Sequence, residues 1–136
     1  MRRLSFILST LPPSLIEVFK IRDVRINESR SCTTLTIEFS PEMLNDYGYI
    51  HGSIIAMLNI IGAESAARFN IREGEALIVV NANLNFIKQP EVFDDLEVEG
   101  CIVTRTDRLI LVSTVIRCGE SDIGRGSALF VIEKIE

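Results

Sequence analysis

The chain has 136 residues, 47% of them hydrophobic and 24% charged, and carries a net charge of −5. This length and apolar content are enough for a single domain, 1–136, with its own core, and no linker rich in Pro, Gly or Ser divides it. The acidic balance and the scattered basic residues exclude the concentrated positive surface that nucleic-acid binding requires, so no nucleic-acid partner is expected.

The cysteine pattern points to an intracellular protein. Cys32, Cys101 and Cys118 are odd in number and lack the spacing of metal ligands. We therefore expect reduced, mostly buried thiols, without a disulfide or a metal site. These features predict a cytoplasmic location.

The apolar segments of the chain are too short to enter a membrane. The apolar run that follows Arg2 and Arg3 is shorter than a signal peptide requires. The stretch 54–67 is shorter than a membrane span and contains Asn59 and Glu64. We expect a buried helix there and no membrane partner.

In chain order, the first predicted element is a short helix over residues 9–19, where a pair of prolines precedes apolar residues at helical spacing. Alternating, β-branched residues over 20–39, interrupted at 27–30, predict a β-hairpin. Residues 40–49 are predicted to be a loop with one helical turn around 41–44.

A long helix and an antiparallel meander follow. The helix is predicted over 54–69, and a polar turn over 70–75 comes next. Four β-type runs complete the chain, at 76–87, 96–105, 109–117 and 123–135. A lone helix that is apolar nearly all round needs cover on most sides, which a curved antiparallel sheet provides. The predicted class is α+β, with one long central helix wrapped by the sheet.

A motif precedes the long helix. It consists of Asn45, Gly48, His51 and Gly52, followed by Ser53. With the strand segment 84–90 and the element order, this motif resembles the hotdog-fold acyl-CoA thioesterases of the PaaI-like group, over roughly residues 15–135. The family carries a second glycine where this chain has Ser53.

The resemblance implies a homodimer, and we expect a dimer of dimers, with sites that lie across the subunit boundary. It implies that the Gly52 amide polarises the thioester carbonyl, that Asn45 binds the carbonyl or the attacking water, and that His51 supports the loop. Coenzyme A would be part of the substrate, with no separate cofactor. The physical basis is that an N–H at a positive helix end stabilises the oxyanion of thioester hydrolysis.

One position departs from the family pattern. The family carries its catalytic carboxylate nine residues after the histidine, where this chain has Ile60. Glu64 lies one helical turn further on about the same face and is the predicted base, supplied by the partner chain. A salt bridge is the alternative role of Glu64. Asn59 and Ile60 are predicted to be substrate-binding residues, and the alternative role of Asn59 is that of a hydrogen-bonded core or interface residue.

The phosphates of coenzyme A need local cations in an acidic protein. The candidates are Lys88, Arg105, Arg108 and Arg125. Arg125 stands between two glycines, whose backbone amides would add donors. Each of these residues has an alternative role as a solubilising surface charge.

Three functions remain open. The first is hydrolysis of a small or medium acyl-CoA by Asn45, His51, Gly52 and Glu64. The second is a non-catalytic acyl-CoA-binding protein, a sensor or carrier, which Ile60 favours. The third is a hotdog hydratase, because Asp46 and His51 have the separation of the hydratase dyad. Asn45 and Gly52 also have purely structural alternatives as turn residues.

Overall fold

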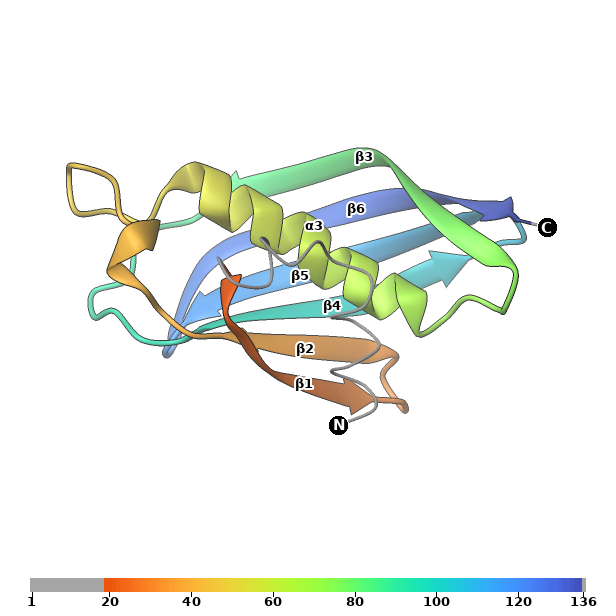
Figure 1. Ribbon diagram of the computed structural model, residues 1–136, viewed down its shortest axis with the longest axis horizontal. Helices are drawn as coiled ribbons and strands as arrows, with labels where there is room; N and C mark the ends of the chain where they lie inside the picture. Colours follow the sequence, from red (N-terminus) through yellow and green to blue (C-terminus); the bar gives the residue numbers. More distant parts are fainter. Residues whose placement is uncertain (1–18, 136) are drawn as a thin grey trace.

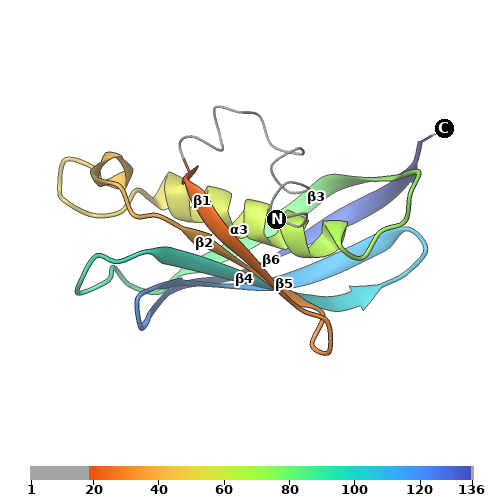
Figure 2. The same cartoon turned by 60° about the horizontal axis from the view of Figure 1, so that its bottom comes forward.

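The computed structural model describes residues 19–135 (Figure 1). In this part of the chain, six strands form one antiparallel sheet in the order β1-β2-β4-β5-β6-β3. The elements are β1 (Ile21–Asn27), β2 (Cys32–Ile37), η1 (Pro41–Met43), α3 (Gly52–Arg68), β3 (Glu75–Phe86), β4 (Leu96–Arg105), β5 (Leu109–Cys118) and β6 (Ser121–Lys134). Helix α3 lies across one face of the curved sheet (Figures 1 and 2). The predicted α+β architecture is confirmed.

The elements follow the predicted order closely. The hairpin forms with its turn at residues 28–31, and the single helical turn forms as η1, where the Ser40 side chain accepts a hydrogen bond from the Glu42 amide. Helix α3 begins two residues earlier than predicted, at Gly52, because His51 has the non-helical backbone conformation of an N-cap, with ψ of 131°. The helix predicted at 9–19 lies outside the described residues, except for Phe19, which is buried.

Close contact between backbones holds α3 against the centre of the sheet. A Cβ on Gly100 of β4 would lie 2.7 Å from the carbonyl oxygen of Gly62 in α3, and a Cβ on Gly62 would overlap the Val98 side chain. Ala63 and Ala66 of the helix are also fully buried. These small residues bring the helix axis close to β4, which fixes the height of the helix above the sheet.

The edge strand β3 contains a bulge at its middle. Its register with β6 shifts between Val79 and Asn81, so Val80 is the extra residue. Ile78, Val79 and Val80 are 50%, 44% and 53% exposed. An edge strand with unpaired backbone groups and exposed apolar side chains is a surface for pairing with another strand.

None of the helical segments within residues 19–135 has the length and apolar character of a membrane span.

The prediction of three reduced cysteines is wrong for two of them. Cys32 and Cys101 lie directly opposite each other in the β2–β4 register, with Cα atoms 4.1 Å apart, and form a disulfide. The spacing along the sequence, 69 residues, gave no sign of this pairing, which the sheet topology creates. Cys118 is free and buried as predicted, and burial raises the pKa of its thiol.

The disulfide predicts a stability that depends on reductant. Because the bond closes a loop of 69 residues, reduction should lower the free energy of unfolding by about 2–4 kcal/mol, as measured by urea unfolding with and without reductant. The double variant Cys32→Ser/Cys101→Ser should show the lower stability under both conditions. Detection of three free thiols in denatured, unreduced protein would contradict this assignment.

Candidate functional site

The loop before α3 is organised by the Asn45 side chain. Its oxygen accepts hydrogen bonds from the amides of Tyr47 and Tyr49, each at 3.0 Å, and Gly48 provides the positive φ of +82° at the turn. Asn45 therefore has the structural role of a turn residue, which was one of the two roles considered for it. Its oxygen is committed to the loop, which leaves the side-chain NH₂ group as the part available to a ligand.

Gln89 clamps this loop to the segment that follows β3. Its side chain accepts a hydrogen bond from the Ile50 amide at 2.9 Å and donates one to the Ile50 carbonyl at 3.1 Å. These two hydrogen bonds occupy both backbone polar groups of Ile50, as a neighbouring strand would. They fix the position of the chain one residue before the helix N-cap. Sequence reasoning missed this role, although Gln89 belongs to the segment that supported the family resemblance.

The head of α3 presents free backbone donors. The His51 amide donates to the Met43 carbonyl at 2.9 Å, and its side chain is exposed and makes no capping hydrogen bond. Within residues 19–135, the amides of Gly52 and Ser53 have no acceptor. A Cβ on Gly52 would lie 3.5 Å from the ring of Phe86, an exposed residue at the end of β3. The helix head thus combines partial positive charge with an adjacent apolar surface.

An accessible stripe runs along α3 from its head. Its members are spaced three or four residues apart and are at least partly exposed: Ser53, Met57, Ile60, Glu64 and Arg68. Glu64 therefore shares a face with Ile60, as predicted. It also lies 3.6 Å from the Arg68 guanidinium, so the salt bridge considered as its alternative role is formed.

Within one chain, the Glu64 carboxylate is far from the amide of Gly52 at the helix head. At 1.5 Å per residue, Ile60 lies about 12 Å and Glu64 about 18 Å from Gly52 along the axis. A carboxylate of the same chain does not reach a carbonyl bound at the Gly52 amide. A complete site with Glu64 as base requires a second chain.

Asn59 is a core residue that connects α3 to three strands. It is 1% exposed, donates to the Asn83 carbonyl of β3 at 3.1 Å, and accepts a short hydrogen bond from Thr114 of β5. A Cβ on Gly126 of β6 would lie 2.6 Å from its side-chain oxygen. The structure shows the hydrogen-bonded core role, and in this chain the Asn59 side chain points into the sheet instead of toward the accessible stripe.

The candidate cations lie at two opposite ends of the molecule. Lys88 follows β3 near the helix head and is exposed, and Arg125 is exposed and paired with Asp122 at 2.9 Å. Arg105 ends β4 and Arg108 precedes β5, at the other end of the sheet. One chain therefore does not bring all four candidates to one place.

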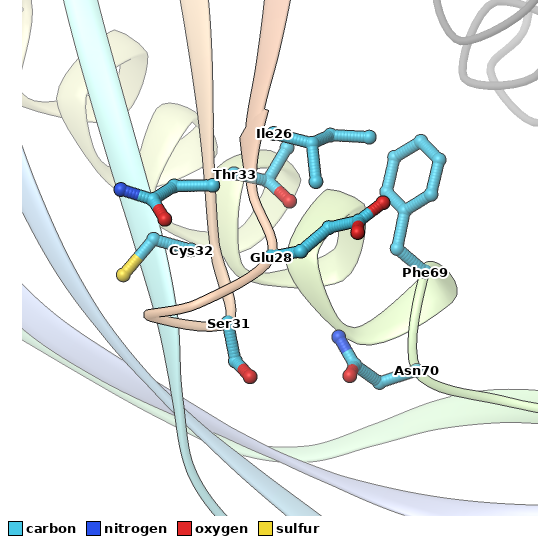
Figure 3. Close-up of a pocket in the computed structure, with 8 residues that line it drawn as sticks. Ile26, Glu28, Ser31, Cys32, Thr33, Phe69 and Asn70 are labelled. Carbon is cyan, nitrogen blue, oxygen red and sulfur yellow. The ribbon is translucent and has the colours of Figure 1, made fainter.

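The hollow in Figure 3 lies away from the helix head. It has a volume of about 240 Å³ and is lined by Ile26, Asn27, Glu28, Ser31, Cys32, Thr33, Phe69 and Asn70, from the β1–β2 hairpin and the end of α3. The Cys32 sulfur points away from Phe69 toward β4, where its disulfide partner lies. This hollow contains none of the predicted site residues.

The sheet order and the single long helix define the hotdog fold, as the resemblance predicted. Solved structures share it: a thioesterase family protein from Silicibacter pomeroyi has a TM-score of 0.84 at 14% identity, covering 98% of this chain and 97% of that chain. The BH2602 protein from Bacillus halodurans, solved with CoA, has a TM-score of 0.79 at 16% identity, covering 99% and 93%.

A further match is the thioesterase HI1161 from Haemophilus influenzae, with a TM-score of 0.80 at 11% identity, covering 89% of this chain and 83% of that chain. No protein-family model and no curated protein matches the sequence. At these identities the likeness shows the fold alone, so the activity has to be inferred from the residues of this chain.

The Asn59 bonds predict a large structural effect. Replacement of Asn59 by Ala leaves the buried Thr114 hydroxyl and Asn83 carbonyl without their partner, and should lower the free energy of unfolding by about 1–3 kcal/mol in urea unfolding. Thr114→Val is the matched partner for a double-mutant cycle with Asn59→Ala. A coupling energy of zero between the two sites would contradict the bond.

Proposed function

We propose that the protein is an acyl-CoA thioesterase, acting on a small or medium acyl group, whose site is shared between two chains of a homodimer. The observation that carries the proposal is the Gly52 amide, free at the positive end of a 17-residue helix and adjacent to exposed Phe86. The hotdog fold supports it, since structures of this fold include thioesterases and one solved with CoA.

Dimer formation supplies the missing carboxylate. The exposed apolar edge of β3 is the surface on which a second copy would extend the sheet, and Glu64 of the partner would then serve the helix head of the first chain. Exposed Ile78 and Leu109 are surfaces for the further pairing of two dimers. A cytoplasmic location belongs to the same proposal, and the Cys32–Cys101 disulfide is the feature that argues against it.

The chemistry follows from the charge that develops during hydrolysis. The partner's Glu64 carboxylate removes a proton from water, whose oxygen attacks the thioester carbonyl carbon. The Gly52 amide stabilises the resulting oxyanion, and the amide group of Asn45 holds the carbonyl oxygen or the water. The C–S bond then breaks, and the departing thiolate takes up the proton that Glu64 removed from water, which gives a carboxylic acid and coenzyme A and restores the carboxylate.

A second function, acyl-CoA binding without hydrolysis, is favoured by one observation. Ile60 occupies the family's acid position, and Glu64 is held by Arg68 at 3.6 Å. A hydratase has less support, because the exposed side chains of Asp46 and His51 share no hydrogen bond.

The oxyanion role of Gly52 can be tested by removing one hydrogen. Gly52 is the first helical residue and His51 has φ −54° and ψ 131°, so proline is compatible with both positions. Gly52→Pro deletes the N–H, whereas Gly52→Ala keeps it and adds an ordinary contact with Phe86. Thiol release by the proline variant should be about 100-fold or more below that of the alanine variant. Equal rates in the two folded variants would exclude the amide.

The base can be tested on the same helix. Glu64→Gln keeps the size of the side chain and removes its ability to accept a proton, so it should abolish thiol release while CoA binding persists. Ile60→Asp should raise the rate, because it restores a carboxylate at the family's position. Measurable CoA binding with background turnover in the parent chain would favour the binding protein over the enzyme.

A further inference from the structure

Two cysteines and a carboxylate meet on the face of the sheet that is turned away from α3. The sulfur atoms of Cys32 and Cys101 and a carboxylate oxygen of Glu99 all lie within 4.8 Å of one another. Within residues 19–135, this is the one group of three cysteine, histidine or carboxylate side chains that comes together so closely. None of the three takes part in the proposed thioesterase site.

The register of β2 with β4 creates this group. The Ile102 amide donates to the Ser31 carbonyl at 3.0 Å, which makes these two residues a hydrogen-bonded pair. Cys32 and Cys101 form the next pair, of the non-hydrogen-bonded kind, in which opposed side chains come closest. Glu99 precedes Cys101 by two residues on β4, so it shares the same face of the sheet.

The group lies on the outer face, away from the helix. Gly100 of β4 faces α3, because a Cβ there would lie 2.7 Å from the Gly62 carbonyl oxygen of the helix. Side chains alternate along a strand, so Glu99 and Cys101, on either side of Gly100, point the other way. Figure 3 shows the Cys32 sulfur directed toward β4. A ligand of this group would therefore leave α3 and its head untouched.

Glu99 has a largely buried carboxylate with an incomplete set of partners. Its side chain is 19% exposed, and the Arg30 guanidinium that faces it lies 3.9 Å away. Among the residues from 19 to 135, no donor makes a hydrogen bond to this carboxylate. A cation bound between it and the two sulfurs would compensate its burial. Arg30 would then balance the single negative charge of a divalent cation with two thiolates and one carboxylate.

We infer that Cys32, Cys101 and Glu99 of the reduced chain bind one zinc ion. Zn²⁺ accepts thiolate sulfur at about 2.3 Å together with carboxylate oxygen at about 2.0–2.2 Å, whereas Ca²⁺ and Mg²⁺ take oxygen ligands. Tetrahedral zinc holds two sulfurs about 3.8 Å apart, which rotation about the Cα–Cβ bonds of the opposed cysteines allows. Three protein ligands leave one position, which water fills.

The disulfide and the zinc site exclude each other because they use the same sulfur atoms. A trialkylphosphine breaks the S–S bond: it takes the oxygen of one water molecule and becomes the phosphine oxide, and the two protons of that water go to the sulfurs. Zinc then displaces these two protons as the Zn–S bonds form. In a reducing compartment, where the disulfide does not persist, zinc would replace it as the link between β2 and β4.

The first experiment titrates the chain with Co²⁺, which takes the place of zinc and reports its ligands by absorption. Protein reduced by phosphine should bind one Co²⁺ per chain, with thiolate-to-cobalt charge-transfer bands, and Zn²⁺ should displace it. The unreduced protein should show no such bands. Cys101→Ser, which leaves Cys32 and the buried Cys118 in place, should abolish them in reduced protein.

The carboxylate ligand has a matched control on the same strand. Glu99→Gln should weaken Co²⁺ binding about tenfold or more, because it removes one of three protein ligands. Glu97→Gln makes the same change of charge two residues earlier on the same face of β4, and should leave the affinity unchanged.

The second experiment measures stability and gives a result even if the reduced chain is unfolded. Because zinc binds the assembled site, it should raise the urea midpoint of the reduced chain, or restore its fold, as its concentration increases. The double variant Cys32→Ser/Cys101→Ser under the same conditions should show no shift.

Several results would overturn the zinc site. They are Co²⁺ binding by the reduced chain without charge-transfer bands, equal binding by the unreduced protein, equal loss of affinity in Glu99→Gln and Glu97→Gln, and a urea midpoint of the reduced chain that zinc does not change. No thioester enters these measurements, so their outcome is independent of the proposed function.

Discussion

The site depends on where α3 begins, and that position is fixed by polar contacts at the head of the helix and at its middle. Gln89 holds Ile50 by two hydrogen bonds, so the chain enters the helix in a defined direction. Further along, Asn59 is bonded to β3 and β5 at the buried face. With Gly62 and Gly100 in close contact, the helix has little freedom to slide or rotate. The exposed amide at its head is therefore preorganised, which is the condition under which such a donor contributes strongly to catalysis.

The same packing keeps the proposed catalytic groups of one chain apart. On the accessible stripe of α3, Ile60 occupies the position at which the resembled family carries its acid. The first carboxylate along the stripe is that of Glu64, and it is paired with Arg68. The positive end of a helix and a carboxylate further along it are kept apart by the stiffness of the helix itself. In the proposed two-chain site the carboxylate comes from a second helix, so the stiffness of one helix does not set its distance from the amide.

The sequence predicted the order of all described elements and located the turn, loop and helix head. Periodicity was sufficient because β-branched alternation and a long apolar run have few competing interpretations. The contacts made by individual side chains could not be predicted from the sequence in the same way. The Cys32–Cys101 bond arises from the register of β2 with β4, and the Gln89 clamp from a meeting of segments 39 residues apart. Asn59 was recognised as polar and central, but its partners depend on how the helix is rotated. Contacts of this kind are set by tertiary geometry and leave no local pattern.

The extra residue in β3 has a consequence for the edge of the sheet. Because Val80 has no partner in β6, the residues that face α3 change from odd positions before it, such as Leu77 and Val79, to even positions after it, such as Ala82 and Leu84. A strand added to this edge has to follow the same change, or its apolar side chains lie on the wrong face of the sheet. A flat edge would accept many registers of addition, and this one excludes most of them.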